Sequence, residues 1–432
     1  MGMTDTDYET MLAGFLGPAG FAVFTAARDG KPHKGACFVP RRLQAETLAE
    51  DFPAARVLDP AGYFSYPFGS LVSDQPLYAG GAFYPLDYSA YCVAKALAGA
   101  LATIPNPKVI DLCAAPGGKS IALSFLSPLG LLVANDIVFK RAQVLKTNLE
   151  RTGVKQAIVT AADPVAFAPR LAGLFDAVIL DAPCSGSGMA RKSAKMAADW
   201  TTAKVVECTV LQRNLLKAAA LLVRPGGLIS YSTCSYSRAE NEDMVAAFLA
   251  ANPDFGPLAP AADGSLAGIG GLGQRYIPGL FPGEGQYACL LRRKETGPLA
   301  PWQPLPLTPV AGFPAIAGLD VAGRTCAVDF CDRRLLALDP LKVGYAVTTS
   351  ERKPKCPYDW DFCHYDPTPF PVFVLSHDQA LAFMRGEDLH CDTAGYDGVI
   401  AVAFYRGFPL AFARGVRGRL RNFLPAGLRL GN

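Results

Sequence analysis

Residues 108–126 read KVIDLCAAPGGKSIALSFL and join a strand-like apolar run to a helical run through a short turn. Residues 108–112 predict a buried strand, and residues 119–126 predict a helix. Between these segments, Gly117 and Gly118 predict a tight turn, where small residues let the backbone pass close to a ligand. Because the helix begins directly after the turn, its first amides point at such a ligand. The stretch therefore predicts a binding loop at the end of a strand.

The same alternation of strand-like and helical runs continues along the chain on both sides of this loop. Such alternation predicts an α/β fold with a mostly parallel, doubly wound sheet that helices cover on both faces. Ligands of such sheets bind at the carboxyl ends of the strands, where the strand order reverses. The expected strands are 108–112, 131–135, 157–160, 177–180, 227–232 and 287–292. The expected helices are 88–102, 119–126, 139–152, 202–223 and 240–250.

The composition of the flanking segments divides the chain into four parts. Short helical patterns mixed with loops precede the core, and a Pro-rich stretch separates the core from a smaller mixed region. We therefore expect an N-terminal lobe (1–90), an α/β core (91–295), a linker (296–318) and a C-terminal domain (319–432).

Overall composition argues against several classes of protein. Half of the residues are hydrophobic and the formal net charge is only +3, so affinity for nucleic acid would have to come from local basic patches. We find no uninterrupted apolar run long enough to cross a bilayer, and the first residues lack the basic-then-apolar pattern of a secretion signal. The twelve cysteines are therefore expected to be reduced thiols in the cytoplasm.

Acidic residues follow the second and third predicted core strands. Asp136 is placed to accept hydrogen bonds from ribose hydroxyls, and Asp163 could meet an adenine amino group. Each acid taken alone is more simply a helix cap. Taken together with the glycine turn, the two acids favour a nucleotide-like cofactor. Since the turn lacks the spaced glycines of a dinucleotide fingerprint, S-adenosylmethionine is favoured over NAD.

Two cysteines stand at the ends of the next two core strands. Cys184 ends the segment Asp181-Ala182-Pro183-Cys184, in which the proline forces the chain out of the strand, and Cys234 ends the segment YSTC. A buried cysteine and a capping aspartate are each common, so either motif alone is compatible with a structural role. Consecutive strand ends would bring both thiols close together, however, and two thiols at one cofactor pocket favour catalysis.

A thiolate beside a methyl donor suits methylation of a pyrimidine. C5 of cytosine is a poor nucleophile, and addition of a thiolate at C6 turns C5 into an enamine carbon that can attack a sulfonium methyl group. An acidic group must stabilise charge at N3, and a base must later remove the C5 proton. The base within the core must be a carboxylate, a thiolate or water, because all four histidines lie elsewhere: His33, His364, His377 and His390.

Several motifs of the core together resemble the RNA 5-methylcytosine methyltransferases. They are the segments 113–119, 181–188 and 231–236, with Asn241 and Glu242 in the following helix. The resemblance implies that Cys234 is the nucleophile, that Cys184 assists release of the product, and that Asp181 contacts the target base. Geometry alone would let the two cysteines exchange roles. The resemblance also implies cofactor contacts from Cys113, Ala114, Ala115, Pro116, Gly117, Gly118, Lys119, Asp136, Asp163 and Asp181.

The C-terminal region is similar to a small PUA-like RNA-binding barrel. It carries a basic cluster that suits contact with phosphates, although a solvated basic face would be the simpler interpretation without the resemblance. The cluster consists of Arg414, Arg417, Arg419, Arg421 and Arg429. Cysteines and histidines in the same region lack the paired Cys-x-x-Cys spacing of a zinc site, so we expect no metal there.

These features together predict a cytoplasmic, S-adenosylmethionine-dependent methyltransferase with a Rossmann-like core of class I. A small α+β lobe before the core and the PUA-like β-rich domain after it would hold RNA. The resemblance implies that the substrate is a cytidine of 16S ribosomal RNA in the small subunit, with neither DNA nor a membrane as partner. Two alternatives remain open, a transfer-RNA cytosine methyltransferase and a non-catalytic RNA-binding factor for ribosome assembly.

Overall fold

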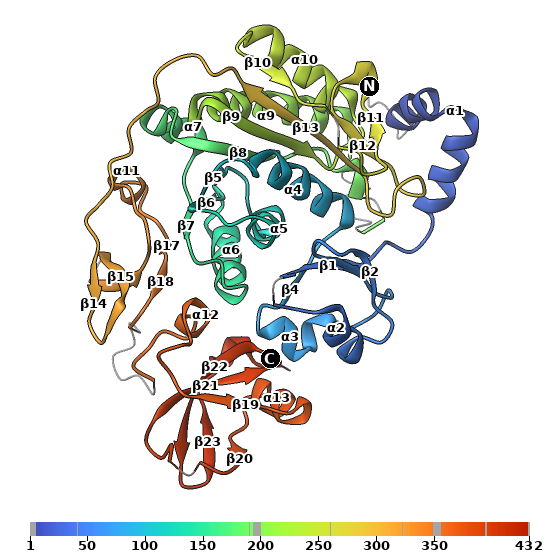
Figure 1. Ribbon diagram of the computed structural model, residues 1–432. Coiled ribbons are helices and arrows are strands. Elements are labelled where there is room, and N and C mark those ends of the chain that lie inside the picture. The colour runs from blue at the N-terminus through green and yellow to red at the C-terminus, as the bar shows by residue number, and fades with distance from the viewer. Residues whose placement is uncertain are drawn as a thin grey trace.

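The computed structural model describes residues 6–40, 42–189, 191–192, 200–259, 261–321, 323–348, 356–393 and 395–430. A ten-stranded sheet forms its centre (Figure 1). Across the sheet the strands are β11 (Leu266–Ala267), β12 (Gln274–Tyr276), β13 (Gln286–Arg293), β9 (Val223–Thr233), β8 (Phe175–Asp181), β5 (Lys108–Asp111), β6 (Leu131–Asn135), β7 (Ala157–Thr160) and β17 (Lys342–Val343), and β10 (Phe255–Pro257) pairs with β13. Strands β5 to β9 are parallel, and β13 runs antiparallel to β9. The strand order reverses beside β5, so the ligand-binding edge lies at the carboxyl ends of β5 and its neighbours.

Helices cover both faces of the sheet because its central strands are buried on both sides. Helices α4 (Tyr88–Leu101), α5 (Gly118–Leu126) and α6 (Phe139–Arg151) share one hydrophobic core with the sheet. Helices α7 (Pro164–Phe167), α9 (Thr202–Leu222) and α10 (Glu242–Ala251) share a second core on the other face. Each predicted core strand and helix is present, and the doubly wound arrangement is confirmed. The helix expected from residue 240 begins at Glu242, because Arg238–Glu240 forms a separate 3-10 turn, η4.

A small antiparallel sheet forms the lobe before the core. Its strands lie in the order β2 (Arg56–Asp59), β3 (Tyr63–Ser65), β1 (Gly35–Phe38) and β4 (Phe83–Pro85), and helices α2 (Ala45–Asp51) and α3 (Pro76–Ala79) pack beside them. The sequence predicted an α+β lobe here. Phe64 and Phe83 are fully buried in its core.

Helix α1 (Thr6–Arg28) lies at the periphery of the molecule, on the side of β11 and β12 (Figure 1). By length and composition alone, the stretch Glu9–Arg28 is long and apolar enough to cross a membrane. Its mean hydropathy is 1.5, and 11% of this stretch is buried. No such run was expected from the sequence. The backbone leaves helical geometry at Gly17, before Pro18, and the helix packs through Phe24 against Tyr236 of the core. This apolar surface therefore serves in part for docking to the core.

A second antiparallel sheet follows the core. Its strands are β14 (Thr308–Val310), β15 (Phe313–Val321), β16 (Arg324–Ala327) and β18 (Tyr345–Ala346), and the short helices nearby are α11 (Arg333–Leu336) and α12 (Phe362–Tyr365). The stretch 296–318, predicted as a linker, thus contains β14 and the first part of β15. Pro309 lies in β14 at the edge of this sheet, where a proline is compatible with pairing, so a Pro-rich composition did not exclude this strand. Strand β17 pairs with β7 and extends the core sheet.

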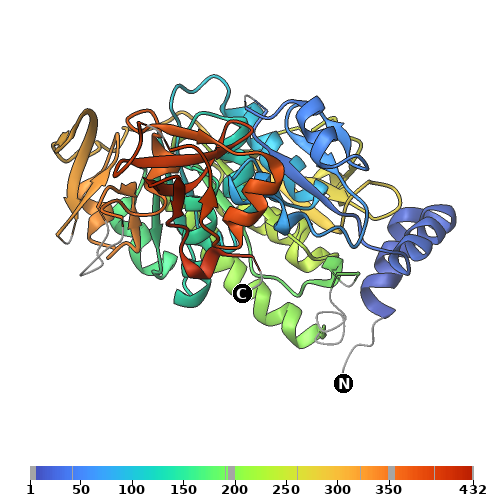
Figure 2. The ribbon, with the colours of Figure 1, turned by 90° about the horizontal axis from the view of Figure 1, so that it is seen from below.

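The last domain is a curled five-stranded sheet, which confirms the expected PUA-like architecture. Its strands lie in the order β19 (Val372–Val374), β21 (Ile400–Tyr405), β22 (Phe408–Val416), β23 (Arg419–Asn422) and β20 (Leu389–His390), with helix α13 (His377–Met384) beside them. Figure 2 shows this domain from below, in front of the lobe and the core. Phe408 and Leu410 share one hydrophobic core with Leu77 and Phe83 of the lobe. The lobe and the C-terminal domain therefore pack directly on each other.

Candidate active site

The turn from β5 to α5 is shaped by its two glycines. Gly117 has a φ of 116°, a left-handed conformation that side chains rarely adopt. A Cβ on Gly118 would lie 2.6 Å from Leu86 Cδ1, so any larger residue there would have to displace the end of this leucine side chain. Before the turn, Asp111 accepts a hydrogen bond of 2.7 Å from Ser120 Oγ, and burial raises the pKa of Asp111 to about 7. The turn is thus anchored from both of its ends.

Asp136 lies directly behind this turn. Its side chain is only 3% exposed, and its Oδ1 accepts from the amide of Val138 at 3.0 Å. Its Oδ2 lies 3.2 Å from Arg141 Nη2, which also donates to the carbonyl of Ala115 at 2.8 Å. The acid after the second strand is therefore connected to the cofactor turn through one guanidinium group.

Asp163 follows the third strand and is exposed. Its Oδ1 accepts from the amide of Val165 at 2.9 Å, so it caps α7 as the simpler sequence interpretation allowed. The loop that carries it is tied to the site by Asn135, whose Oδ1 accepts from the amide of Ala162 at 3.0 Å and whose Nδ2 donates to the carbonyl of Leu112 at 3.1 Å. The contact of Asp163 with a cofactor stays a prediction.

Asp181 ends β8 with its carboxylate held from two sides. Its Oδ1 accepts from Ser232 Oγ at 2.8 Å, and its Oδ2 lies 2.7 Å from Lys119 Nζ. The Lys119 side chain is 8% exposed, whereas that of Asp181 is 40% exposed. The ammonium group is therefore nearly enclosed, while the carboxylate keeps a face open to a ligand.

The two cysteines meet at this same edge of the sheet. Asp181 of β8 is paired in register with Ser232 of β9, so the chains leave the sheet side by side. Cys184 Sγ lies 3.2 Å from Cys234 Sγ. The hydrogen bond to Cys234, together with burial, raises the pKa of Cys184 well above its usual range. Cys184 is therefore a thiol at neutral pH and can donate a hydrogen bond to the sulfur of Cys234.

A cavity of about 320 Å³ opens in front of these groups. The predicted site residues that line it are Ala114, Ala115, Pro116, Gly118, Lys119, Asp181 and Cys234. The predicted residues that are not part of this lining are Cys113, Gly117, Asp136, Asp163 and Cys184. The structure thus brings the cofactor turn, the strand-end aspartate and one thiol to a single cavity.

Sequence reasoning missed a group of charged residues at the cavity, of which Asp87, Lys192 and Glu284 line it. Lys192 Nζ lies 3.3 Å from Asp87 Oδ2, and Arg191 Nε lies 2.9 Å from Glu284 Oε2. The amide of His33 donates to Glu284 Oε1, which lies 251 residues further along the sequence. Burial lowers the pKa of the His33 imidazole. These residues occupy loops without a periodic pattern, so only the fold brings them together.

The residues at the strand ends fit S-adenosylmethionine. The contact of Asp136 with ribose hydroxyls stays a prediction, and exposed apolar side chains stand beside both acids, Ile137 at 60% and Val165 at 47% exposure. The amides at the start of α5 face the same region. No cluster of three or more His, Cys, Asp or Glu side chains suited to a metal occurs among the described residues.

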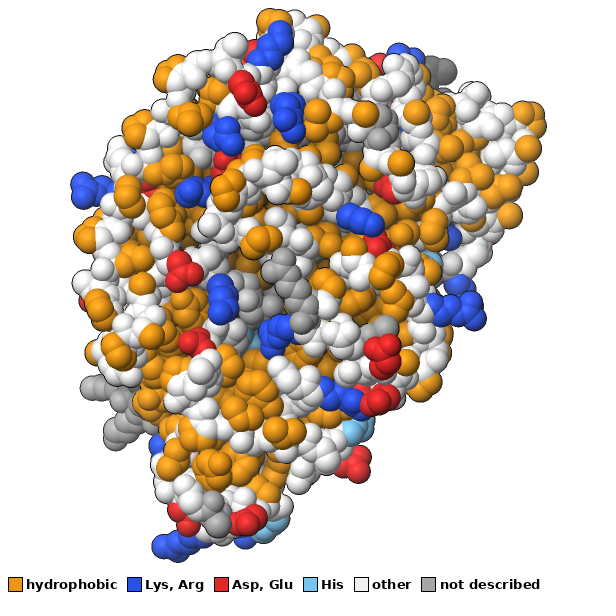
Figure 3. All heavy atoms as spheres, in the orientation of Figure 1, with side chains coloured by type: hydrophobic (Ala, Val, Ile, Leu, Met, Phe, Trp, Pro, Cys, Tyr) orange, Lys and Arg blue, Asp and Glu red, His pale blue; other side chains and the backbone are white. Residues whose placement is uncertain are grey.

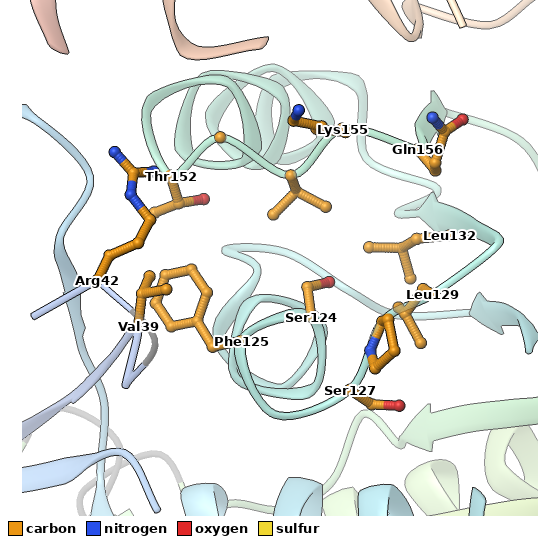
Figure 4. A pocket seen from close by; sticks show the side chains of 13 residues that line it. Val39, Arg42, Ser124, Phe125, Ser127, Leu129, Leu132, Thr152, Lys155 and Gln156 are labelled. Atoms are coloured by element: carbon orange, nitrogen blue, oxygen red, sulfur yellow. The ribbon is translucent and has the colours of Figure 1, made fainter. Parts of the chain in front are cut away.

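A larger cavity, about 450 Å³, lies at the opposite edge of the sheet (Figure 4). It is lined by the ends of α5 and α6, by Leu132 and Gln156 near the starts of strands β6 and β7, and by Val39 and Arg42 of the lobe. None of the predicted site residues lines it. This cavity is a junction between domains and is separate from the cysteine site.

The predicted basic cluster is largely gathered on one hairpin. Strands β22 and β23 pair Arg414 with Arg421, and Arg417 and Arg419 follow at and after the turn. Arg429 instead donates to the carbonyl of Leu424 at 3.1 Å within its own domain. On the face shown in Figure 3, basic and acidic side chains are interspersed among neutral and hydrophobic ones. Any phosphate contact would therefore be local.

Known proteins resemble the chain over most of its length. A family model described as 16S rRNA methyltransferase RsmB/F matches residues 98–292, and one described as methyltransferase RsmF PUA domain matches residues 370–430. Ribosomal RNA small subunit methyltransferase F of Klebsiella pneumoniae (strain 342) is 29% identical over 393 residues, covering 83% of this chain and 80% of that protein. The protein of the same name from Aeromonas hydrophila is 29% identical over 392 residues, covering 84% and 81%.

Solved structures share the fold. PH0851 superimposes with a TM-score of 0.60 at 25% identity, covering 66% of this chain and 65% of that chain. NSun6 from Pyrococcus horikoshii, solved with SFG, gives a TM-score of 0.56 at 19% identity, covering 67% of this chain and 98% of that one.

Proposed function

This chain belongs to the RsmB/F family of methyltransferases, and from that premise we propose that it methylates C5 of a cytidine in 16S ribosomal RNA. S-adenosylmethionine is the methyl donor, and the reaction passes through a covalent bond between Cys234 and C6 of the base. The observation that carries the proposal is the pair of thiols 3.2 Å apart at the cofactor edge, next to Asp181. We place the enzyme in the cytoplasm, where ribosomal subunits of bacteria are made.

Cys234 begins the reaction by adding to C6 of a cytosine that has left its stack. The sulfur atoms of Cys184 and Cys234 lie 3.2 Å apart, so the Cys184 thiol can donate a hydrogen bond to the attacking sulfur. Asp181 faces the cavity and is held by Lys119 and Ser232, so its carboxylate can accept a hydrogen bond from a donor on the edge of the base. When bound, S-adenosylmethionine supplies an electrophilic methyl group for the activated C5.

Cys184 acts at the end of the reaction. Once a base has taken the C5 proton, the bond between C6 and sulfur breaks and the electron pair returns to Cys234. A thiol beside this departing sulfur stabilises the thiolate that forms, and the raised pKa of Cys184 keeps its proton in place for that purpose. Cys184 therefore assists release, while Cys234 carries the covalent bond.

Substitution of each cysteine tests this division of roles. Cys234→Ala should abolish methyl transfer to 16S RNA in a tritium assay while calorimetry still detects binding of S-adenosylmethionine. Cys184→Ala should trap a protein–RNA adduct that survives denaturing electrophoresis. Cys208→Ala, a thiol on α9, serves as the matched control and should turn over normally. If Cys234→Ala forms the adduct instead, the two roles are reversed.

The target RNA needs a separate experiment. Bisulfite sequencing of total RNA from a strain without this gene should show the loss of one methylated cytidine in 16S RNA. A lost site in transfer RNA would identify the alternative substrate. Unchanged RNA, together with inactivity of the purified protein on small subunits and transfer RNA, would favour a non-catalytic assembly factor.

A further inference from the structure

Glu240 is a fully buried carboxylate that the reaction described above leaves unused. It lies in η4, between the strand that carries Cys234 and helix α10. Its Oε1 accepts from the amide of Ser185 at 2.8 Å and from Gln212 Nε2 at 3.1 Å. Its Oε2 accepts from the hydroxyl groups of Ser185 and Ser235. Four donors therefore converge on one buried anion.

The two serines are the residues that directly follow the two reactive cysteines. Ser185 follows Cys184, and Ser235 follows Cys234, so one carboxylate holds both loops. Charge-assisted hydrogen bonds of this kind are about twice as strong as neutral ones and fix the position of their donors. The 3.2 Å separation of the sulfur atoms thus has a local cause.

Glu240 holds the loop of Cys184 at its backbone, whereas it holds the segment after Cys234 through the side chain of Ser235. Thr233, next to Cys234, is still paired with Tyr287 of β13, and the carbonyl of Cys234 accepts from the amide of Gly188 at 2.8 Å. Beyond β8, by contrast, the amide of Ser185 is bound by Glu240. Removal of the carboxylate would leave that amide buried without this acceptor.

We propose that Glu240 is a positioning residue for product release, which holds the thiol of Cys184 against the sulfur of Cys234. The proposal rests on the covalent mechanism proposed above. Its specific consequence is that loss of Glu240 should reproduce in part the behaviour of Cys184→Ala. The enzyme would still form the bond to C6 and would break it slowly.

The test measures two quantities in each variant, turnover and the fraction of enzyme trapped as an RNA adduct. In Glu240→Ala we expect turnover to fall on the order of 10²-fold, the effect of misplacing a reacting group by about 1 Å, and the adduct to accumulate. Ser185→Ala should also lower turnover and raise the fraction of trapped adduct, each by a smaller factor. This variant decides the test if Glu240→Ala does not fold.

Glu242→Gln is the matched control. Glu242 is as buried as Glu240 and lies two residues further on, but its carboxylate pairs with Arg275. This variant should lose stability without accumulating adduct. If turnover and adduct fall in parallel in Glu240→Ala and Ser185→Ala, or if neither changes, Glu240 has no role in release and the proposal is wrong. If Cys184→Ala itself traps no adduct, the covalent mechanism fails before the role of Glu240 is reached.

Discussion

Breaking the Lys119–Asp181 ion pair from its two ends should have unequal effects on stability. The ammonium of Lys119 is nearly enclosed at 8% exposure, whereas the carboxylate of Asp181 is 40% exposed. In Asp181→Asn the buried ammonium group of Lys119 stays and loses its counter-ion. In Lys119→Met the carboxylate of Asp181 stays, and water can reach it while Ser232 still donates to it. We therefore expect Asp181→Asn to be the more destabilising variant.

The magnitude follows from the geometry. Two unit charges 2.7 Å apart attract by about 6 kcal/mol at an effective dielectric constant of about 20, before the cost of removing both groups from water. Desolvation and the partial exposure of Asp181 reduce the net value, so a charge-assisted hydrogen bond contributes about 1.5–3 kcal/mol. Asp181→Asn should lose about that amount, and Lys119→Met about 0.5–1 kcal/mol, as for a partly exposed pair.

Urea denaturation followed by the fluorescence of the three tryptophans, of which Trp200 is buried, measures both variants. The double variant Asp181→Asn with Lys119→Met removes both charges and should be more stable than Asp181→Asn alone. Equal losses in the two single variants, or a larger loss in Lys119→Met, would show that the enclosure of the ammonium group does not govern the energetics of this pair.

Three further outcomes are expected. Burial raises the pKa of Asp111 from 3.8 to about 7, so the folded protein holds a proton that the unfolded chain releases between these values, and stability should fall as pH rises through this window. Asp111→Asn should remove that part of the slope in urea midpoints measured from pH 4 to 8. Gly188→Ala would place a Cβ 2.8 Å from the carbonyl oxygen of Cys234, so adduct formation should fall while calorimetry still detects the cofactor. Arg419→Glu with Arg421→Glu should weaken RNA binding and reduce the slope of log affinity against log salt by about 2, as filter binding would show.

The core was predictable because its signals are local. Strand-like runs such as 131–135 and 157–160 are wholly buried and have the expected bounds. The site followed because parallel strands deliver their carboxyl ends to one edge, so the positions of Asp181 and both cysteines along the chain were enough to group them.

Other features depend on tertiary pairing that no local pattern carries. Strand β17 is two residues long and exists because Lys342 and Val343 pair with the edge of the core sheet. The Pro-rich stretch became β14 and β15 for the same reason. His33 contacts Glu284 of the cavity lining and Glu240 lies buried beneath the two cysteines, yet their partners lie in distant segments or in loops without periodicity.

The register of two strands explains why such a buried anchor is needed at all. Pairing of Asp181 with Ser232 brings β8 and β9 to the edge in step, but it is the last pair of that ladder. Cys184 and Cys234 both stand beyond it, where β8 and β9 no longer pair and the distance between the two sulfur atoms is not set by their ladder. A sheet can therefore bring two thiols to the same cavity without holding them in contact. Hydrogen bonds past the sheet join the two segments, such as that of the Gly188 amide to the carbonyl of Cys234, and the carboxylate of Glu240 adds a buried acceptor for the residues that follow both cysteines.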